Sequence, residues 1–566
     1  MNIDDIFTER VGGIAAGGGG RGKRKLAAAP SLSELRQHGY ALNEDSEETA
    51  PAAKRPHTSA APDSDGESDG DSEGGRFFSS GLTQHEKQVL AWVDQGDDAA
   101  DGEDTVEGGG KLLARVQRAV ERNTKQRVRH ADAPLKFADS EADLDAALRA
   151  LLPLAGASEG CAQLAGHAEL LVGLLAHANA DIAGDVVELV HEASVDSDAD
   201  AWVLVDALAQ ADFFDALGAN LRRLDGASEY SADDDATVAR TLDIVGALAS
   251  QQPARAPEYL RSMRLPEWLL ESLGARSEAR QLLAAEALAD LLPATPHVHT
   301  LFLEAQAPWR LLARMLAPAA AEVLENCADA LCALLLTARG KQAFAPVAGR
   351  LAQMCPGDAH MRMLACKILA HALAPADVAA EEEENAVDAR RESALAFVRE
   401  GGVKLLGYAV LRRGVTRGLL REHPAADERA VSCLALTLRL THGAPAHWRV
   451  LAKFLPSAAA PQDAAWKRHV DRLVELDVLY AERVAAQQDE HEEVVEEETR
   501  VAAVHALHMA NVALGFVALA GDATRERIER LLRRRARSLD HVARELHGSA
   551  DAAVTAADLE RLLLQQ

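Results

Sequence analysis

A glycine-rich stretch near the start of the chain has the spacing of a phosphate-binding loop. GGGGRGK, residues 17–23, fits the pattern G-x-x-x-x-G-K. A working loop also needs Ser or Thr at the next position to reach Mg²⁺, and a strand before the first glycine. Arg24 occupies that next position, and no strand pattern precedes the glycines. We therefore attribute the match to the glycine run and expect no nucleotide site.

Histidines and cysteines give no stronger indication of chemistry. His505 and His508 are one helical turn apart, but no third ligand or H-E-x-x-H pattern accompanies them. No C-x-x-C or G-x-S-x-G pattern occurs. The cysteines mostly lie in apolar helix patterns, which is typical of buried free thiols in a reducing compartment: Cys161, Cys327, Cys332, Cys355, Cys366 and Cys433. We expect a non-enzymatic protein with no cofactor and no metal site.

A stripe of carboxylates on one predicted helix is the most distinctive chemical pattern. In the segment 180–195, the acidic residues recur at i, i+4, i+7 and i+11: Asp181, Asp185, Glu188 and Glu192. An apolar stripe, which should face the core, recurs beside them at Ile182, Val186, Leu189 and Ala193. Like charges at this spacing cost roughly 0.2–0.5 kcal/mol per pair. Either a basic partner offsets that cost or the stripe is simply the solvated face of an acidic protein.

The elements that position these residues are predicted to be helices arranged in repeats. Hydrophobic residues make up 48% of the chain but aromatic residues only 4%, which favours an all-α protein. A short apolar helix, a polar turn and a longer helix recur about every 40–50 residues, the period of armadillo and HEAT repeats. The fold is therefore predicted to be an α-solenoid. We expect an N-terminal helical segment at 81–155, the repeat array at 156–455 and a helical C-terminal region at 456–566.

The acidic stripe recurs on the longer helices of later repeats. In armadillo arrays the third helix of each repeat lines the concave groove, so successive stripes would form one acidic trough for a Lys/Arg-rich peptide. Asp233–Asp235 begin one such helix. The predicted groove residues beyond the first helix are Glu286, Asp290, Glu322, Glu325 and Asp329. A solvated acidic surface remains the alternative.

Residues 1–80 are predicted to be a disordered tail, because Gly/Ala-rich and Asp/Ser-rich sequence cannot form a packed core. Its exposed basic clusters suggest a nuclear localisation signal formed by Lys23, Arg24, Lys25, Lys54 and Arg55. The acidic segment 375–391 is interpreted as a loop between helices, and 524–547 as one basic helix.

The net charge of −28 argues against general nucleic-acid binding, which needs clustered Lys and Arg. No apolar run is judged long enough for a membrane span, and the first residues lack the basic-then-apolar order of a signal peptide. We expect no direct nucleic-acid or membrane partner. The sequence leaves monomer and homodimer open.

Several long stretches resemble the beta-catenin-like protein 1 family of spliceosome-associated armadillo proteins. These are LLVGLLAHANADIAGDVVELVHEASVDSDAD, VLVDALAQADFFDALGANLRRLDGAS, VARTLDIVGALAS, LENCADALCALLL and WKRHVDRLVELDVLY. They follow the family's order over about 120–520. The alanine bias and the insert near Glu381–Glu384 depart from the family. The resemblance implies a function in pre-mRNA splicing in the nucleus, within or alongside the NineTeen complex. It also implies binding to basic localisation-signal segments, notably of that complex's Myb-domain, Cdc-five-like subunit.

Other classes of protein remain as alternatives. An importin-alpha-like transport receptor grips basic peptides with Trp-x-x-x-Asn pairs, but none of the six tryptophans has Asn four residues later. A ubiquitin ligase would need a RING or U-box segment, and none is visible. A scaffold that binds partners through its C-terminal helices would bind them independently of salt.

Overall fold

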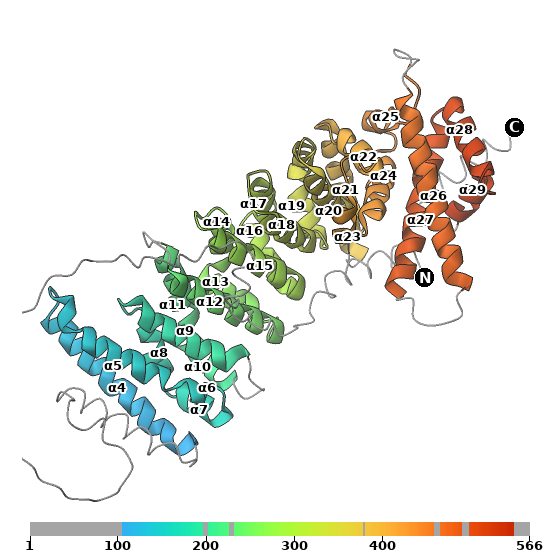
Figure 1. Cartoon of the computed structure of the whole chain (residues 1–566). Coiled ribbons are helices and arrows are strands. Elements are labelled where there is room, and N and C mark those ends of the chain that lie inside the picture. Colours follow the sequence, from blue (N-terminus) through green and yellow to red (C-terminus); the bar gives the residue numbers. More distant parts are fainter. Residues whose placement is uncertain are drawn as a thin grey trace, which may run out of the picture. The chain divides into compact units, whose positions relative to one another are not determined.

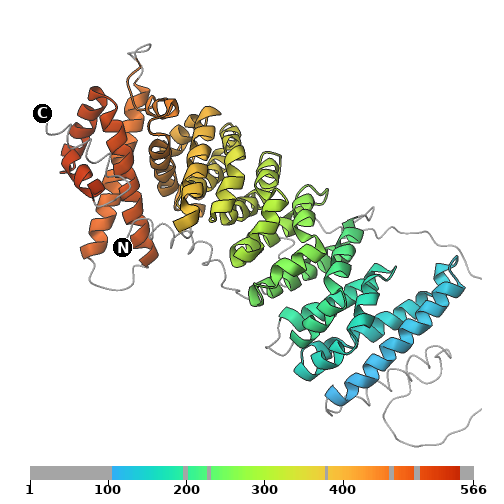
Figure 2. The same cartoon turned by 180° about the vertical axis from the view of Figure 1, so that it is seen from behind.

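The computed structural model describes residues 105–547, apart from 196–201, 226–230, 377–379, 458–463 and 490–496. Within these ranges every regular element is a helix (Figures 1 and 2), and the predicted all-α solenoid is confirmed. The predicted disordered tail 1–80 and its basic residues lie outside the described residues. The domain boundaries stay predictions.

The described chain begins with a long helix and a group of short ones. The 25-residue α4 buries Leu113 and Val116. Because α5 and α6 pack against the first long repeat helix, α9, they cover the start of the array. The bounds of this group are α4 Thr105–Arg129, η1 Pro134–Lys136, α5 Ala138–Arg149 and α6 Leu152–Ala155.

Two short helices followed by a longer one form the repeating unit. The short helices are α7 Ser158–Ala165, α8 Ala168–Leu175, α10 Trp202–Gln210, α11 Phe213–Asp225, α13 Ala256–Met263, α14 Leu265–Ser272, η3 Pro296–Val298, α16 His299–Glu304, α17 Ala307–Met315, α19 Ala338–Phe344 and η4 Ala345–Met354. The longer helices that follow them are α9 Ala180–Val195, α12 Ala232–Gln251, α15 Glu278–Ala294, α18 Ala321–Leu334 and α20 Ala359–Leu373.

The longer helices stack directly on one another. α9 contacts α12, α12 contacts α15, α15 contacts α18, and α18 contacts α20. The series continues through α24 Ala426–Thr441 to α27 Glu497–Leu519. We call these seven helices the long-helix row. Its residues share one continuous apolar core with the short helices, as expected when each repeat buries its apolar face against its neighbours.

Small residues at the helix contacts explain the alanine-rich composition. Ala284 and Ala285 of α15 and Ala328 of α18 are fully buried, and these two helices contact each other. Gly218 of α11 is a closer case, because a Cβ there would lie 2.4 Å from the carbonyl oxygen of Met263. Without large side chains, adjacent helices approach closely at native packing density.

The acidic segment interpreted as a loop over 375–391 is instead largely helical. α21 spans Ala380–Arg399 and packs against η4, α19 and α24. Its buried residues include Ala386, Ala389, Ala394 and Phe397. These buried residues recur at helical spacing, so the loop prediction was wrong. α22 Val403–Val410 and α23 Arg417–Glu422 then precede α24.

The C-terminal region contains α25 Pro445–Leu451, α26 Ala465–Asp489, α28 Asp522–Arg533 and α29 Leu539–His547. The single basic helix predicted over 524–547 is wrong, because the chain turns between α28 and α29, where Ala536 has a positive φ of 55°. Arg537 there donates two hydrogen bonds, at 2.9 and 3.1 Å, to the fully buried side chain of Asp477.

One helix among the described residues is long and apolar enough to cross a membrane. It covers Arg500–Leu519 in α27, contrary to the expectation that no stretch reaches that length. However, 83% of its apolar window is buried inside the structure, against α24 and α26 among others. A buried core helix passes the same test, so this is weak evidence for a membrane span.

Candidate acidic docking surface

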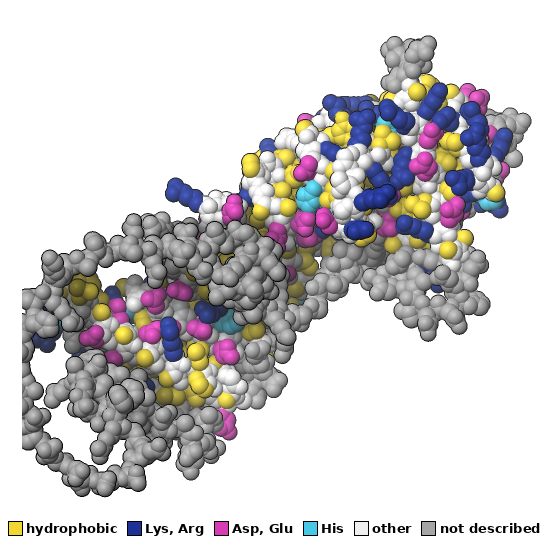
Figure 3. Space-filling model, viewed as in Figure 1, with side chains coloured by type: hydrophobic (Ala, Val, Ile, Leu, Met, Phe, Trp, Pro, Cys, Tyr) yellow, Lys and Arg dark blue, Asp and Glu magenta, His cyan; other side chains and the backbone are white. Residues whose placement is uncertain are grey.

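Charge is distributed unevenly along the long-helix row. α9 and α12 carry four acidic residues each, and α15 and α18 carry three each. We call these four the acidic helices; their sequences contain no lysine and only two arginines, Arg240 and Arg280. The next helix, α20, contains Arg362 and Lys367 and no acidic residue. In Figure 3, Lys and Arg side chains accordingly gather over the later helices, at upper right.

On α9 the apolar stripe lies as predicted, but the acidic stripe divides. Ile182, Val186, Leu189 and Ala193 are all buried, so the predicted core face is confirmed. Asp181 and Glu192, near the ends of the helix, are exposed. Asp185 is only 6% exposed, because α5 packs across the middle of α9. The expectation that all four carboxylates face solvent was therefore wrong for Asp185.

Asp185 sits in a cluster of two carboxylates and one guanidinium. Its Oδ1 lies 3.3 Å from Arg149 Nε, and Arg149 Nη2 also lies 3.0 Å from Asp145 Oδ1. Asp185 Oδ2 is buried, and no N–H group among the described residues donates to it. Burial raises the pKa of Asp185 to about 7, the hydrogen bond and charge of Asp145 also raise it, and Arg149 opposes both. Near neutral pH this side chain therefore supplies only part of a negative charge.

The remaining ionic contacts of α9 run to its neighbour in the row. Glu188 Oε1 accepts a hydrogen bond from Arg240 Nη2 of α12 at 3.1 Å, and both side chains are about one-third exposed. His191 Nε2 lies 3.4 Å from Asp243 Oδ2 of the same helix. Arg240, one of the two arginines of the acidic helices, is thus paired with a carboxylate of the row itself.

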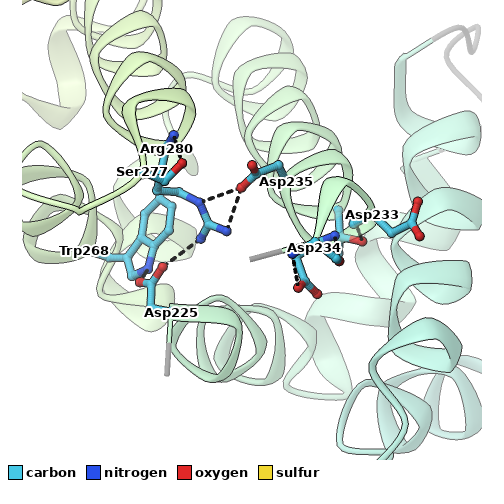
Figure 4. Close-up of polar contacts among 9 residues, drawn as sticks. Asp225, Asp233, Asp234, Asp235, Trp268, Ser277 and Arg280 are labelled. Atoms are coloured by element: carbon cyan, nitrogen blue, oxygen red, sulfur yellow. Dashed lines mark hydrogen bonds and ion pairs between the residues drawn. The ribbon is translucent and has the colours of Figure 1, made fainter. Parts of the chain in front are cut away.

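The other arginine, Arg280, is fully buried and joins three helices (Figure 4). Its Nη1 donates to Asp225 Oδ1 of α11 at 2.7 Å, and its Nε and Nη2 donate to Asp235 Oδ1 of α12 at 3.2 and 3.0 Å. Trp268 Nε1 donates a second hydrogen bond to the Asp225 carboxylate. Ser277 caps α15 by accepting from the Arg280 backbone N–H at 3.3 Å. We call this group the Arg280 cluster.

The acidic start of α12 also has a local structural role. Ser231 Oγ accepts from the Asp234 N–H at 3.0 Å, and the Asp234 carboxylate accepts from the Ser231 N–H at 3.0 Å, forming a capping box. Carboxylates in the first turn also interact favourably with the helix dipole. Of the three consecutive aspartates, Asp233 is the exposed one.

α15 and α18 carry both exposed and partly buried carboxylates. Asp290 and Glu322 are exposed, whereas Glu286 is half-buried. Glu325 Oε1 lies 3.5 Å from His360 Nε2 and 4.0 Å from His423 Nε2. Asp329 pairs with the amine of Lys367 on α20.

The nine predicted groove residues therefore fall into two groups. Exposed side chains that can meet a partner belong to Asp181, Glu192, Asp290 and Glu322. Buried or half-buried side chains belong to Asp185, Glu188, Glu286, Glu325 and Asp329. The structure places all nine on stacked helices of one row, as the repeat pattern predicted. Their role in binding stays a prediction.

Comparison with known proteins places this architecture in a family. A family model described as "Catenin-beta-like, Arm-motif containing nuclear" matches residues 87–547. The chain belongs to this family. Catenin-beta-like proteins are thus described as nuclear proteins with Arm motifs, which agrees with the helical repeats seen here.

Curated members of the catenin-beta-like family align over part of the chain. Beta-catenin-like protein 1 of Rattus norvegicus is 30% identical over 251 residues, 41% of this chain and 44% of that protein. The homolog of Schizosaccharomyces pombe is 29% identical over 294 residues, 48% of this chain and 51% of that protein. The chain thus spans about half the length of the curated relatives it matches. A crystal structure of an engineered protein aligns with 74% of this chain and 95% of its own, at 16% identity and a TM-score of 0.41.

The thiols of this catenin-beta-like chain are structural. All six cysteines are buried and free, as predicted. Burial raises the pKa of Cys327 and of Cys332 to about 12, which disfavours the nucleophilic thiolate form. Inert thiols agree with an Arm-repeat family whose members are typically non-catalytic scaffolds.

Two polar groups were missed in the sequence. The Arg280 cluster joins residues 43–55 positions apart, and the second group brings Glu325 together with His360 and His423. One signal for the first was available, because Arg280 is the one basic residue in the sequence of α15. The second had no local signal, because its histidines meet only through the stacking of repeats.

Proposed function

We propose that this protein is a non-enzymatic nuclear adaptor that binds Lys/Arg-rich segments of splicing proteins along the acidic helices. The observation that carries the proposal is the charge imbalance of α9, α12, α15 and α18, in which both arginines are engaged by internal carboxylates. The exposed carboxylates Asp181, Glu192, Asp290 and Glu322 are therefore not neutralised by a cation of the same helices. A basic partner segment would supply that cation.

The physical basis of recognition is charge pairing at a partly exposed surface. Hydrogen bonds between ionised groups are roughly twice as strong as those between neutral groups. Complementary potentials also raise the association rate. Exposed ion pairs contribute only about 0.2–1 kcal/mol each and are screened by salt. Affinity should therefore come from several carboxylates acting along the row.

Family membership guides the choice of partner. The resemblance to spliceosome-associated beta-catenin-like proteins supports basic localisation-signal segments of splicing factors as ligands, in particular the Myb-domain, Cdc-five-like subunit of the NineTeen complex. Nuclear residence, which the family description supports, would bring the protein to such partners.

Charge reversal at the exposed carboxylates tests the proposal. In the row variant, Asp181, Glu192, Asp290 and Glu322 are each replaced by Lys. In the control variant, the same charge change is made at exposed acids of the short helices, namely Glu159, Glu169, Asp215 and Glu258. Calorimetric titration with a basic splicing-factor peptide should show about tenfold weaker binding for the row variant than for the control.

Salt provides the second measurement. Affinity of the unmodified protein should fall between about 0.05 and 0.2 M salt, because the Debye length shortens to below about 10 Å, and the row variant should show a shallower dependence. If peptide binding is weakened equally in the row and control variants, the effect comes from net charge and not from the row. Binding independent of salt and of the row would favour a scaffold that uses its C-terminal helices.

A further inference from the structure

Three potential metal ligands from separate repeats meet beside the end of the acidic helices. Glu325 projects from α18, His360 lies in the first turn of α20, and His423 directly follows α23. One ligand atom from each residue lies within 4.8 Å of the other two. The imidazole rings of the two histidines have centroids 5.4 Å apart.

The ring nitrogens that face this point are not engaged by the rest of the fold. Nε2 of His360 and Nε2 of His423 are both buried, and neither makes a hydrogen bond among the described residues. A buried polar atom without a partner costs about 1–3 kcal/mol. The nearest carboxylate atom, Glu325 Oε1, lies 3.5 Å from His360 Nε2 and 4.0 Å from His423 Nε2, beyond ordinary hydrogen-bond length.

These separations approach those of a tetrahedral metal site. Zn–N and Zn–O bonds of about 2.0–2.2 Å place adjacent ligand atoms about 3.3–3.6 Å apart in a tetrahedron. The separation of 3.5 Å between Glu325 Oε1 and His360 Nε2 lies in this range, and that of 4.0 Å to His423 Nε2 is longer. The Glu325 side chain is 44% exposed, whereas those of His360 and His423 are 16% and 12% exposed. The ligand set is thus open to solvent on the Glu325 side, where water can complete the coordination.

Cationic side chains lie near the three ligands, including Arg429 and Lys367. Lys367 is itself paired with Asp329. The same cations repel a metal ion, so the carboxylate of Glu325 is the ligand that must supply negative charge.

We propose that Glu325, His360 and His423 form a binding site for a divalent transition metal, with Zn²⁺ as the ion that fits best. Two imidazole nitrogens, one carboxylate and a water molecule are an established tetrahedral ligand set for Zn²⁺. The site would cross-link α18, α20 and the connection between α23 and α24. This inference does not depend on peptide binding. The alternative to a metal site is an ionic contact in which protonated histidines pair with Glu325.

Metal binding is tested on the full chain after treatment with a chelator. Zn²⁺ is titrated calorimetrically, and Co²⁺ is titrated by visible absorption, which reports tetrahedral coordination. The variants are Glu325→Gln, His360→Gln and His423→Gln, and the matched control is His297→Gln, whose side chain is exposed in η3. The unmodified protein should bind one Zn²⁺ that raises its melting temperature. Each ligand variant should bind it roughly tenfold or more weakly, whereas the control should match the unmodified protein.

The glutamate variant decides the result if a histidine variant fails to fold, because Glu325 is nearly half exposed and its replacement by Gln preserves shape. Weaker Zn²⁺ binding by Glu325→Gln, with an unchanged circular dichroism spectrum, supports the site. Equal Zn²⁺ affinity and stoichiometry in Glu325→Gln and the unmodified protein would overturn it and leave the ionic contact. Failure of the unmodified protein to bind Zn²⁺ at about 0.1 mM would overturn it as well.

Discussion

Replacing Asp185 by Asn should stabilise the repeat array, and the gain should grow with pH. Asp185 is buried between α5 and α9, and its pKa is raised to about 7, from 3.8, mainly by loss of solvation. In the unfolded chain its pKa returns to about 3.9. The folded state therefore holds this proton more tightly than the unfolded state. Ionisation of Asp185 lowers the free energy of unfolding progressively as pH rises from about 4 to about 7.

The size of the effect follows from the interval between the two pKa values. Each pH unit within that interval changes the free energy of unfolding by about 1.4 kcal/mol. From pH 5 to pH 8 the free energy of unfolding of the unmodified protein should thus fall by about 2–3 kcal/mol relative to that of the Asn variant. Asp145→Asn should reduce this pH dependence, because Asp145 contributes to the raised pKa of Asp185.

Urea denaturation at pH 5, 6, 7 and 8, together with amide hydrogen exchange of α9, measures the difference between the two proteins. Asp181→Asn is the matched control, because it makes the same chemical change at an exposed position of the same helix. A difference between Asp185→Asn and the unmodified protein that stays constant or shrinks as pH rises would refute the reasoning. It would mean that pairing with Arg149 outweighs burial.

Two further predictions concern the core and the Arg280 cluster. Leu189→Ala should lower the free energy of unfolding by about 2–5 kcal/mol, because Leu189 is buried in the core; hydrogen exchange should accelerate around residues 160–250, and an unchanged melting curve would contradict the packing. Arg280→Met should cost roughly 3 kcal/mol by leaving Asp225 and Asp235 without their buried cation. Adding Asp225→Asn and Asp235→Asn should restore part of the melting temperature, and no restoration would show that packing of Arg280, rather than its charge, is what matters.

The helical repeats were predictable because they depend on local periodicity. The apolar stripe Ile182, Val186, Leu189 and Ala193 defines one face of a helix without any knowledge of its neighbours. The acidic face of that helix was predictable in the same way. The burial of Asp185 on this face was not predictable, because the sequence does not reveal that α5 packs against α9 there.

Longer-range polar contacts were beyond local patterns for the same reason. Arg280 of α15 meets Asp225 of α11 and Asp235 of α12 only because helices of neighbouring repeats pack together. The segment 375–391 was wrongly predicted to be a loop because of the acidic run 381–384. The helical spacing of Ala386, Ala389 and Phe397 was present in the sequence and is the pattern that predicts α21. The spacing of the apolar residues, and not the acidic composition, predicts the secondary structure of this segment.

The charge of the long-helix row changes from negative on α18 to positive on α20, so the two ends of the row differ in charge. A partner segment that is basic along its whole length would meet attractive charge over α9–α18 and repulsive charge at α20. A segment with a basic end and an acidic end would be attracted in one orientation along the row and repelled in the other, because complementary charge fixes register as well as strength. Selection among partners would then depend on the order in which their charges occur along the chain, in addition to how many charges they carry.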